Sequence, residues 1–161
     1  MKHVTQFAII LCLMISHSHP LYSSELAPWG AASLLDIKYK PNKVVYDLKS
    51  GDKNYVSRVL SRAIHLQSNI YESDTFDSSI VMVIHGDAVP LFAIENLKKY
   101  RDMMDRAQSS TVGTSIEFRM CRVAARQRNY EAKDIHGFVD MVPMADAEIV
   151  KLQHDNYAYM R

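Results

Sequence analysis

Cysteine is almost absent from this sequence of 161 residues, which holds only Cys12 and Cys121. A small disulfide-rich scaffold is therefore excluded, because such scaffolds need several cysteine pairs. The glycine-rich and histidine-containing motifs of dinucleotide-binding proteins, P-loop NTPases, zinc proteases and α/β-hydrolases are also missing. The sequence thus offers none of the common short motifs from which an enzyme class is read directly.

An excess of charge of either sign is missing as well. The formal net charge is +1, and Lys2 is the only charged residue before Glu25, so 18 basic and 18 acidic residues remain beyond residue 24. Binding to nucleic acid or to an anionic membrane surface needs a basic excess, and neither is indicated. With 48% hydrophobic and 23% charged residues, the composition predicts one globular domain.

No hydrophobic run is long enough for a typical membrane span. The apolar run Phe7–Ile15 has nine residues, whereas a spanning helix needs about 20. Small residues follow at Ser16–Ser18 and again at Tyr22–Ser24, as in the cleavage region of a secretory signal peptide. We expect residues 1–24 to be a signal peptide cleaved between residues 18 and 24, with a retained anchor as the alternative. The mature protein is then periplasmic or secreted and has no membrane attachment.

Export leaves Cys121 as the single cysteine of the mature chain. In an oxidising compartment, a lone cysteine is either buried and inert or a reactive thiol that pairs with another molecule. Residues 25–42 carry Pro28 and Pro41 and lack a clean periodicity, so we expect an extended lead-in there. The folded domain is expected over residues 43–161.

Strands and helices are predicted to alternate through this domain. Apolar strands are expected at 44–48, 79–84, 114–120, 139–142 and 157–160, and helices at 53–70, from Pro90 to 107, in a short arginine-rich stretch after Cys121, and at 145–154. The connections are too long for hairpins. The order predicts a three-layer α/β/α sandwich with a mostly parallel sheet of about five strands.

Several polar or reactive residues follow directly on predicted strands. Asp47 and Asp52 lie at the end of the first strand, His85 and Gly86 after the second, and Cys121 after the third. In parallel sheets, ligands bind beyond the carboxyl ends of the strands. This edge is therefore the predicted site.

Cys121 is the first candidate for chemistry at this edge. It ends a strand and begins a helix, and Arg122 and Arg126 lie four residues apart on that helix, with Arg119 and Arg128 nearby. Positive charge and helix-terminal N–H groups lower the pKa of a cysteine and favour its reactive thiolate. The alternative is a cysteine packed as a small hydrophobic residue, with the arginines solvated.

His85 is the second candidate, as a proton donor beside Cys121. The alternative is that its side chain caps the following helix or satisfies a turn carbonyl, which is the commoner use of such residues. Gly86 predicts a backbone with positive φ. Asp47 and Asp52 are candidates for ligand binding or for helix capping. The histidines outside this edge have no metal-ligand spacing, so no metal and no organic cofactor is expected.

Several separated segments resemble the exported branch of the DsrE/DsrF-like family. They are VYDL at 45–48, VIHGD at 83–87, FRMC at 118–121, IHGFVDMVPMA at 135–145 and EIVKLQHDNYAYM at 148–160. The resemblance implies an α/β sandwich that assembles into trimers or hexamers. It also implies that Cys121 carries sulfane sulfur as a persulfide between donor and acceptor proteins or small polysulfides. The chain departs from the branch at residues 122–125, where RVAA replaces a more polar stretch.

Two functions from different classes follow from these observations. The first is a sulfur carrier that uses Cys121, with Arg122 and Arg126 stabilising and steering anionic sulfur species. The second is a non-catalytic oligomeric module that binds a small ligand or a protein and in which Cys121 is structural; a thiol redox sensor is a weaker third possibility. Exposure of the Cys121 sulfur distinguishes the first two, because a carrier must present it.

Overall fold

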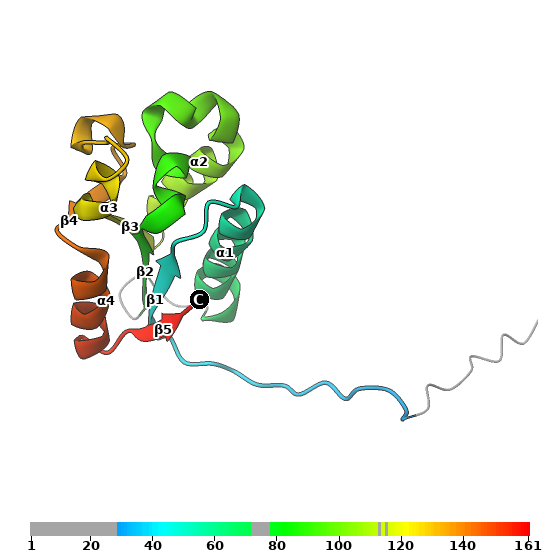
Figure 1. The fold of residues 1–161 in the computed structure, drawn as a ribbon. Coiled ribbons are helices and arrows are strands. Elements are labelled where there is room, and N and C mark those ends of the chain that lie inside the picture. Colours follow the sequence, from blue (N-terminus) through cyan, green and yellow to red (C-terminus); the bar gives the residue numbers. More distant parts are fainter. Residues whose placement is uncertain (1–28, 72–77, 113, 115) are drawn as a thin grey trace, which may run out of the picture. The chain divides into compact units, whose positions relative to one another are not determined.

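A computed structural model describes residues 29–71, 78–112, 114 and 116–161 of the chain. The predicted signal peptide and its cleavage region lie outside these residues. The chain divides into residues 1–36 and 37–161, and the fold below is that of the second part (Figure 1). Its strands are β1 (Lys43–Leu48), β2 (Ser79–Ile84), β3 (Ile116–Cys121), β4 (Val139–Val142) and β5 (Ala158–Met160). Its α-helices are α1 (Lys53–His65), α2 (Leu97–Thr111), α3 (Arg122–Arg126) and α4 (Ala145–His154).

The five strands form one parallel sheet in the order β4-β3-β2-β1-β5. Helices α1 and α2 lie on one side of this sheet and α4 on the other, which confirms the three-layer α/β/α sandwich (Figure 1). Strands β1 and β2 are almost wholly buried, and so they read as continuous apolar runs rather than as alternating ones. The chain steps from strand to strand in one direction as far as β4 and then returns to the opposite edge through α4.

Strand β3 alternates between the two faces of the sheet. Ile116, Phe118 and Met120 are buried in the core, whereas Glu117 and Arg119 on the opposite face are more open. Since side chains of a strand alternate, Cys121 lies on the same face as Glu117 and Arg119. This is the face that α4 partly covers.

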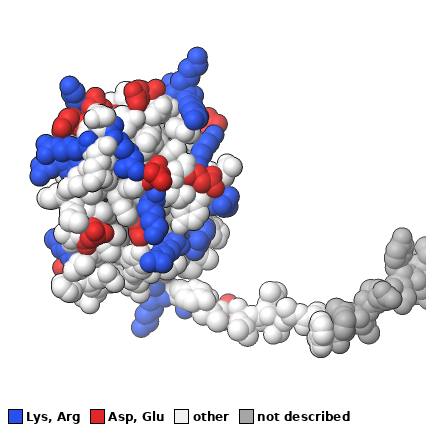
Figure 2. All heavy atoms as spheres, in the orientation of Figure 1, with Lys and Arg blue, Asp and Glu red and all other residues white. Residues whose placement is uncertain are grey.

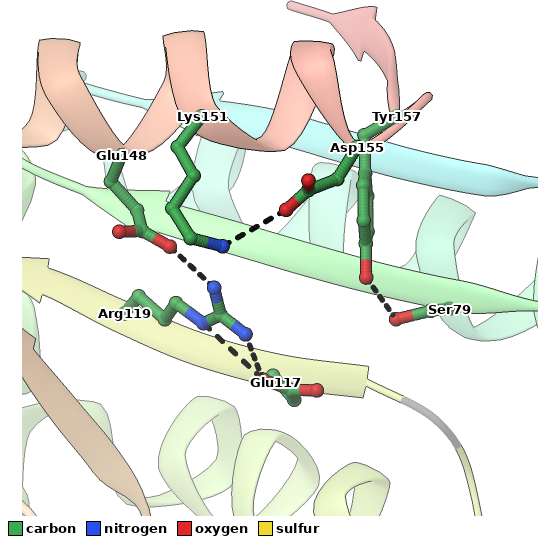
Figure 3. A network of polar contacts seen from close by, with 7 residues as sticks. All are labelled: Ser79, Glu117, Arg119, Glu148, Lys151, Asp155 and Tyr157. Atoms are coloured by element: carbon green, nitrogen blue, oxygen red, sulfur yellow. Dashed lines mark hydrogen bonds and ion pairs between the residues drawn. The ribbon is translucent and has the colours of Figure 1, made fainter.

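Arg119 holds α4 against this face of the sheet. Its guanidinium pairs with Glu117 on the same strand at 2.6 Å and with Glu148 on α4, as Figure 3 shows. Lys151 of α4 pairs with Asp155 at 2.9 Å in the same network. The positive charge of Arg119 is therefore paired with the carboxylates of Glu117 and Glu148.

The predicted helix boundaries were partly wrong. Asp52 caps α1 as predicted, accepting a hydrogen bond from the Asn54 N–H at 2.8 Å, but α1 ends at His65 and residues 66–70 form a π-helical turn. Pro90 does not begin an α-helix; it lies inside a 3₁₀ segment, Gly86–Phe92, and α2 starts only at Leu97. The third strand is shifted to Ile116–Cys121, while β4 and α4 occupy the predicted residues.

Within the part of the chain that the structure describes, no helix is long and apolar enough to cross a membrane. Basic and acidic side chains are mixed on the visible surface of the domain (Figure 2). This face therefore lacks the continuous basic patch that nucleic acid binding requires.

Candidate functional site

Three neighbouring strands bring Asp47, His85 and Cys121 to the same face and the same edge of the sheet. Asp47 of β1 is in register with Val83 of β2, and Val83 is in register with Arg119 of β3. In-register residues of parallel strands point to the same side, and so do residues two apart on one strand. His85 is two residues beyond Val83 and Cys121 two beyond Arg119, so both join Asp47 on the α4 face.

Asp47 is a buried carboxylate with both oxygens hydrogen-bonded. His85 Nε2 lies 2.5 Å from Oδ1, and the Tyr159 hydroxyl donates to Oδ2 at 2.6 Å. Burial works to raise the pKa of Asp47, but the hydrogen bonds from Tyr159 and His85, together with the charges of His85 and Lys49, outweigh burial. The pKa of Asp47 therefore lies below its ordinary value, and the carboxyl is ionised at neutral pH.

His85 neither caps the following helix nor bonds a turn carbonyl with its ring, so the prediction of those roles was wrong. Its side chain instead pairs with Asp47, and its main-chain N–H donates to Leu48 O at 2.9 Å. The side chain is 22% exposed, whereas Asp47 is 8% exposed. His85 is thus the solvent-facing member of a carboxylate–imidazole pair.

Gly86 turns the chain sharply after His85. Its φ is +54°, as predicted, and its N-terminal neighbour is fully extended. A Cβ at Gly86 would lie 3.1 Å from Lys49 O, and the next N–H, of Asp87, donates to that same oxygen at 3.0 Å. Glycine is therefore required at this position both by φ and by the close approach of the turn after β1.

Cys121 is buried, with 5% of its surface exposed. It is the last residue of β3 and the N-cap of α3, and its sulfur accepts a hydrogen bond from the Ala124 N–H at 3.4 Å. Within the described residues it is the free cysteine. The position at the strand end is the predicted one, whereas the low exposure is the outcome expected of a structural cysteine and not of a carrier.

A cleft of about 270 Å³ opens at Cys121. It lies beyond the carboxyl ends of β2, β3 and β4, and in parallel sheets ligands bind outside this edge. Its lining residues are His85, Gly86, Cys121, Val123, Ala124, Gln127, Arg128, Met144, Ala145 and Asp146.

His85 and Cys121 therefore face one cleft from adjacent strands. Strands of a sheet are about 4.8 Å apart, and extending the β2–β3 register by one residue places His85 opposite Cys121. In this structure, the Cys121 sulfur is hydrogen-bonded to Ala124 and the His85 ring to Asp47, with no hydrogen bond joining the two residues.

The arginines are not arranged as the sequence predicted. Arg122 and Arg126 are exposed and do not line the cleft, and Arg126 pairs with Glu131 at 3.3 Å. Arg128 is the arginine of the cleft; it pairs with Asp87 at 2.6 Å and donates to Ala124 O at 3.4 Å. Helix α3 ends at Arg126, and Asn129 with φ +61° turns the chain back, which separates Arg128 from the outer helical face.

Tyr159 and Asp146 are the site residues that sequence reasoning missed. Tyr157 and Tyr159 are two residues apart, so the sequence indicates that they face the same side of a strand, but it does not indicate that this strand pairs with β1. Only that pairing brings Tyr159 to Asp47. Asp146 comes from the first turn of α4, whose N-terminal end meets the cleft.

No group of three or more histidine, cysteine or acidic side chains within residues 29–71, 78–112, 114 and 116–161 is arranged to hold a metal ion. The site as described thus consists of a thiol, an imidazole–carboxylate pair, one arginine and backbone N–H groups. Such a set can bind an anion and move a proton beside a sulfur nucleophile.

Comparison with known proteins bears on the fold alone. No family model matches the chain, and no curated protein matches it. Among solved structures, the chain is similar to MTH1491 of Methanobacterium thermoautotrophicum, described as a protein of unknown function, with a TM-score of 0.62 and 21% sequence identity. The match covers 74% of this chain and 98% of that chain. It supports the three-layer α/β architecture.

Proposed function

We propose that this protein carries sulfane sulfur as a persulfide on Cys121. The observation that carries the proposal is that Cys121 lies in the wall of a cleft of about 270 Å³, with its sulfur hydrogen-bonded by the Ala124 N–H and with His85 and Arg128 in the same wall. The resemblance of residues 118–121, 135–145 and 148–160 to the DsrE-like family supports the same function.

The transfer needs no oxidant or reductant. The Cys121 thiolate attacks the outer sulfur of a donor persulfide R–S–SH, the S–S bond of the donor breaks, and the donor leaves as R–S⁻ while Cys121 becomes Cys–S–SH. The thiolate of an acceptor then attacks the outer sulfur of this persulfide, takes it, and regenerates the Cys121 thiolate. The sulfane sulfur keeps its oxidation state throughout.

Because the Cys121 sulfur is recessed and not presented at the surface, a carrier of this kind needs donors and acceptors that reach into the cleft. A persulfide is easily oxidised or lost to other thiols, and a recessed sulfur meets only partners that fit the cleft. The Ala124 N–H stabilises negative charge on the cysteine sulfur, and the Arg128 guanidinium provides a positive charge for an anionic donor such as a small polysulfide. The placement of Arg128 favours it over Arg122 and Arg126 as the residue that contacts sulfur species.

We further propose that the carrier works as an exported homotrimer or homohexamer, since a signal peptide is predicted at residues 1–24 and the family resemblance implies such assemblies. Donor and acceptor are thiol proteins or small polysulfides. A monomer mass in light scattering would contradict the assembly, and Met1 retained in protein from the exported fraction would contradict the cleavage.

A second candidate function is favoured by the 5% exposure of Cys121 and by its role as N-cap of α3. In that case, the cysteine only stabilises the turn, and the cleft binds a small anionic ligand or a protein segment through Arg128 and His85. The two functions differ in whether the Cys121 sulfur forms a covalent bond.

Incubation of the mature protein with polysulfide, followed by intact-mass measurement, tests the proposal. We expect the wild type to gain the mass of one or more sulfur atoms and to lose it on treatment with dithiothreitol, because a thiol reduces a persulfide. Cys121→Ser should show no gain. Arg128→Ala is expected to slow the uptake about tenfold, since it removes a charge-assisted contact with the donor anion.

Arg122→Ala is the matched control, because Arg122 lies on the same stretch and is exposed away from the cleft. It should take up sulfur at the wild-type rate. A folded wild type that gains no sulfur, while Cys121 reacts only after unfolding, would refute the carrier and leave the binding module.

A further inference from the structure

A line of hydrogen bonds leads from the edge of the sheet to the cleft. Arg161 Nε donates to the Tyr159 hydroxyl at 3.2 Å, the Tyr159 hydroxyl donates to Asp47, and Asp47 holds His85. The residues come from β5, β1 and the turn after β2, three segments that are adjacent in the sheet. The distances of 2.5 and 2.6 Å on the two oxygens of Asp47 are those of strong, charge-assisted hydrogen bonds.

This arrangement determines which nitrogen of His85 can exchange protons. Asp47 is ionised and can only accept hydrogen bonds, so Nε2 must carry the hydrogen that it shares with Oδ1. The hydrogen on Nε2 is therefore donated to Asp47. In the neutral ring Nδ1 has no hydrogen, and it is the nitrogen left to act as a base or, once protonated, as an acid.

We propose that Asp47 and Tyr159 are positioning residues that fix His85 with Nδ1 available to the cleft, where it takes the proton of the Cys121 thiol and later returns it. This rests on the proposed sulfur transfer. Nδ1 accepts the proton of Cys–SH, the resulting thiolate attacks R–S–SH, and the leaving R–S⁻ takes the proton back from Nδ1–H⁺ as R–SH. Protons and charge balance, and His85 ends neutral.

The logic is that of a nucleophile, a base and a residue that orients the base. Here the orienting group is itself held by Tyr159, since a carboxylate with a second hydrogen bond cannot rotate away from the imidazole without losing that bond. The other ionisable groups that share the cleft with His85 are Cys121, Arg128 and Asp146, and Asp87 next to Gly86 is paired with Arg128. The one arginine at the cleft thus lies beside two carboxylates, Asp87 and Asp146.

The chain offers a matched pair of variants for testing this relay. Tyr159→Phe removes the hydroxyl that holds Asp47, whereas Tyr157→Phe removes a hydroxyl two residues away that pairs with Ser79 at 2.9 Å and lies outside the relay (Figure 3). Asp47→Asn removes the charge that orients His85. The measured quantity is the rate of Cys121 alkylation by iodoacetamide as a function of pH, in the folded full-length mature protein.

We expect Asp47→Asn to slow alkylation at neutral pH by about a hundredfold, the size of a general-base contribution, because the amide no longer fixes the Nε2–H form. Tyr159→Phe should slow it by roughly tenfold or more, which corresponds to one lost hydrogen bond to a charged group. Tyr157→Phe should keep both the rate and the pH profile of the wild type. Nitrogen NMR of the wild type should show His85 with hydrogen on Nε2.

The relay is overturned if Tyr159→Phe and Tyr157→Phe share the wild-type profile, if NMR finds the hydrogen on Nδ1, or if Cys121 alkylates only in the unfolded protein. Should Asp47→Asn fail to fold, Tyr159→Phe and the NMR of the wild type still decide the matter. The two proposals fail separately. A profile that depends on Tyr159 without any uptake of sulfur refutes the carrier alone, and uptake of sulfur with an unchanged Tyr159→Phe profile refutes the relay alone.

Discussion

Phe118→Ala is expected to lower the free energy of unfolding by about 3–5 kcal/mol, which is the usual cost of deleting a buried phenylalanine ring. Phe118 is 1% exposed and lies at the centre of an aromatic cluster. Its ring centroid is 6.0 Å from that of Phe92 and 5.4 Å from that of Phe138, the latter in an edge-to-face arrangement. Its removal would leave a cavity between β3 and the segments before α2 and β4.

Urea denaturation followed by circular dichroism measures this loss. The control is Val150→Ala on α4, where the side chain is 51% exposed and the change should stay within about 0.5 kcal/mol. Equal midpoints for the two variants would show that the aromatic cluster does not stabilise the domain as its burial indicates.

Gly86→Ala is expected to destabilise the domain by about 2 kcal/mol or more. A side chain at φ +54° costs about 1–2 kcal/mol by itself, and the new Cβ would press on Lys49 O at 3.1 Å. The turn after β2 would have to move away from the turn after β1. Because Gly86 follows His85 directly, the same change should also disturb the pairing of His85 with Asp47, on which the proposed relay depends.

Gly137→Ala is the control for this substitution. A Cβ at Gly137 would meet no atom within 4 Å, and the φ of Gly137 is not in the positive range that disfavours side chains. The change should leave the free energy of unfolding within about 0.5 kcal/mol of the wild type, or raise it slightly through the stiffer unfolded chain. If both glycine variants unfold at the same denaturant concentration, the strain argument for Gly86 is wrong.

The fold could be predicted because its signals are local. Apolar runs of strand length at 44–48 and 79–84 alternate with helical stripes, and this order nearly determines a parallel sheet. The helix after β2 was misplaced for an equally local reason. Proline is a common first residue of helices, but here two 3₁₀ segments, Gly86–Phe92 and Ile94–Asn96, precede α2. The preference of Pro90 does not distinguish an α-helix from a 3₁₀ segment.

The site could be predicted only in part. Strands β1, β2 and β3 are neighbours because each is joined to the next by one crossover connection. This is why Asp47, His85 and Cys121 were expected at one edge of the sheet. The position of β5 beside β1 is a long-range feature that no local pattern encodes, so the contact of Tyr159 with Asp47 was missed. The direction of Arg128 depends on where α3 ends and on its carboxylate partner Asp87, which lies 41 residues away in the sequence.

The short length of β5 has a thermal consequence. This strand contributes three residues, lies at the edge of the sheet and pairs on one side only, whereas the Tyr159–Asp47 bond that it supplies spans 112 residues of sequence. Edge segments with few hydrogen bonds open locally at a lower free energy than the whole domain. On warming, the hydrogen bond from Tyr159 to Asp47 should therefore break while the remaining strands stay folded. In the proposed relay, proton transfer at Cys121 would then weaken below the melting temperature of the domain, so that fraying of one strand, rather than unfolding, would limit the relay at high temperature.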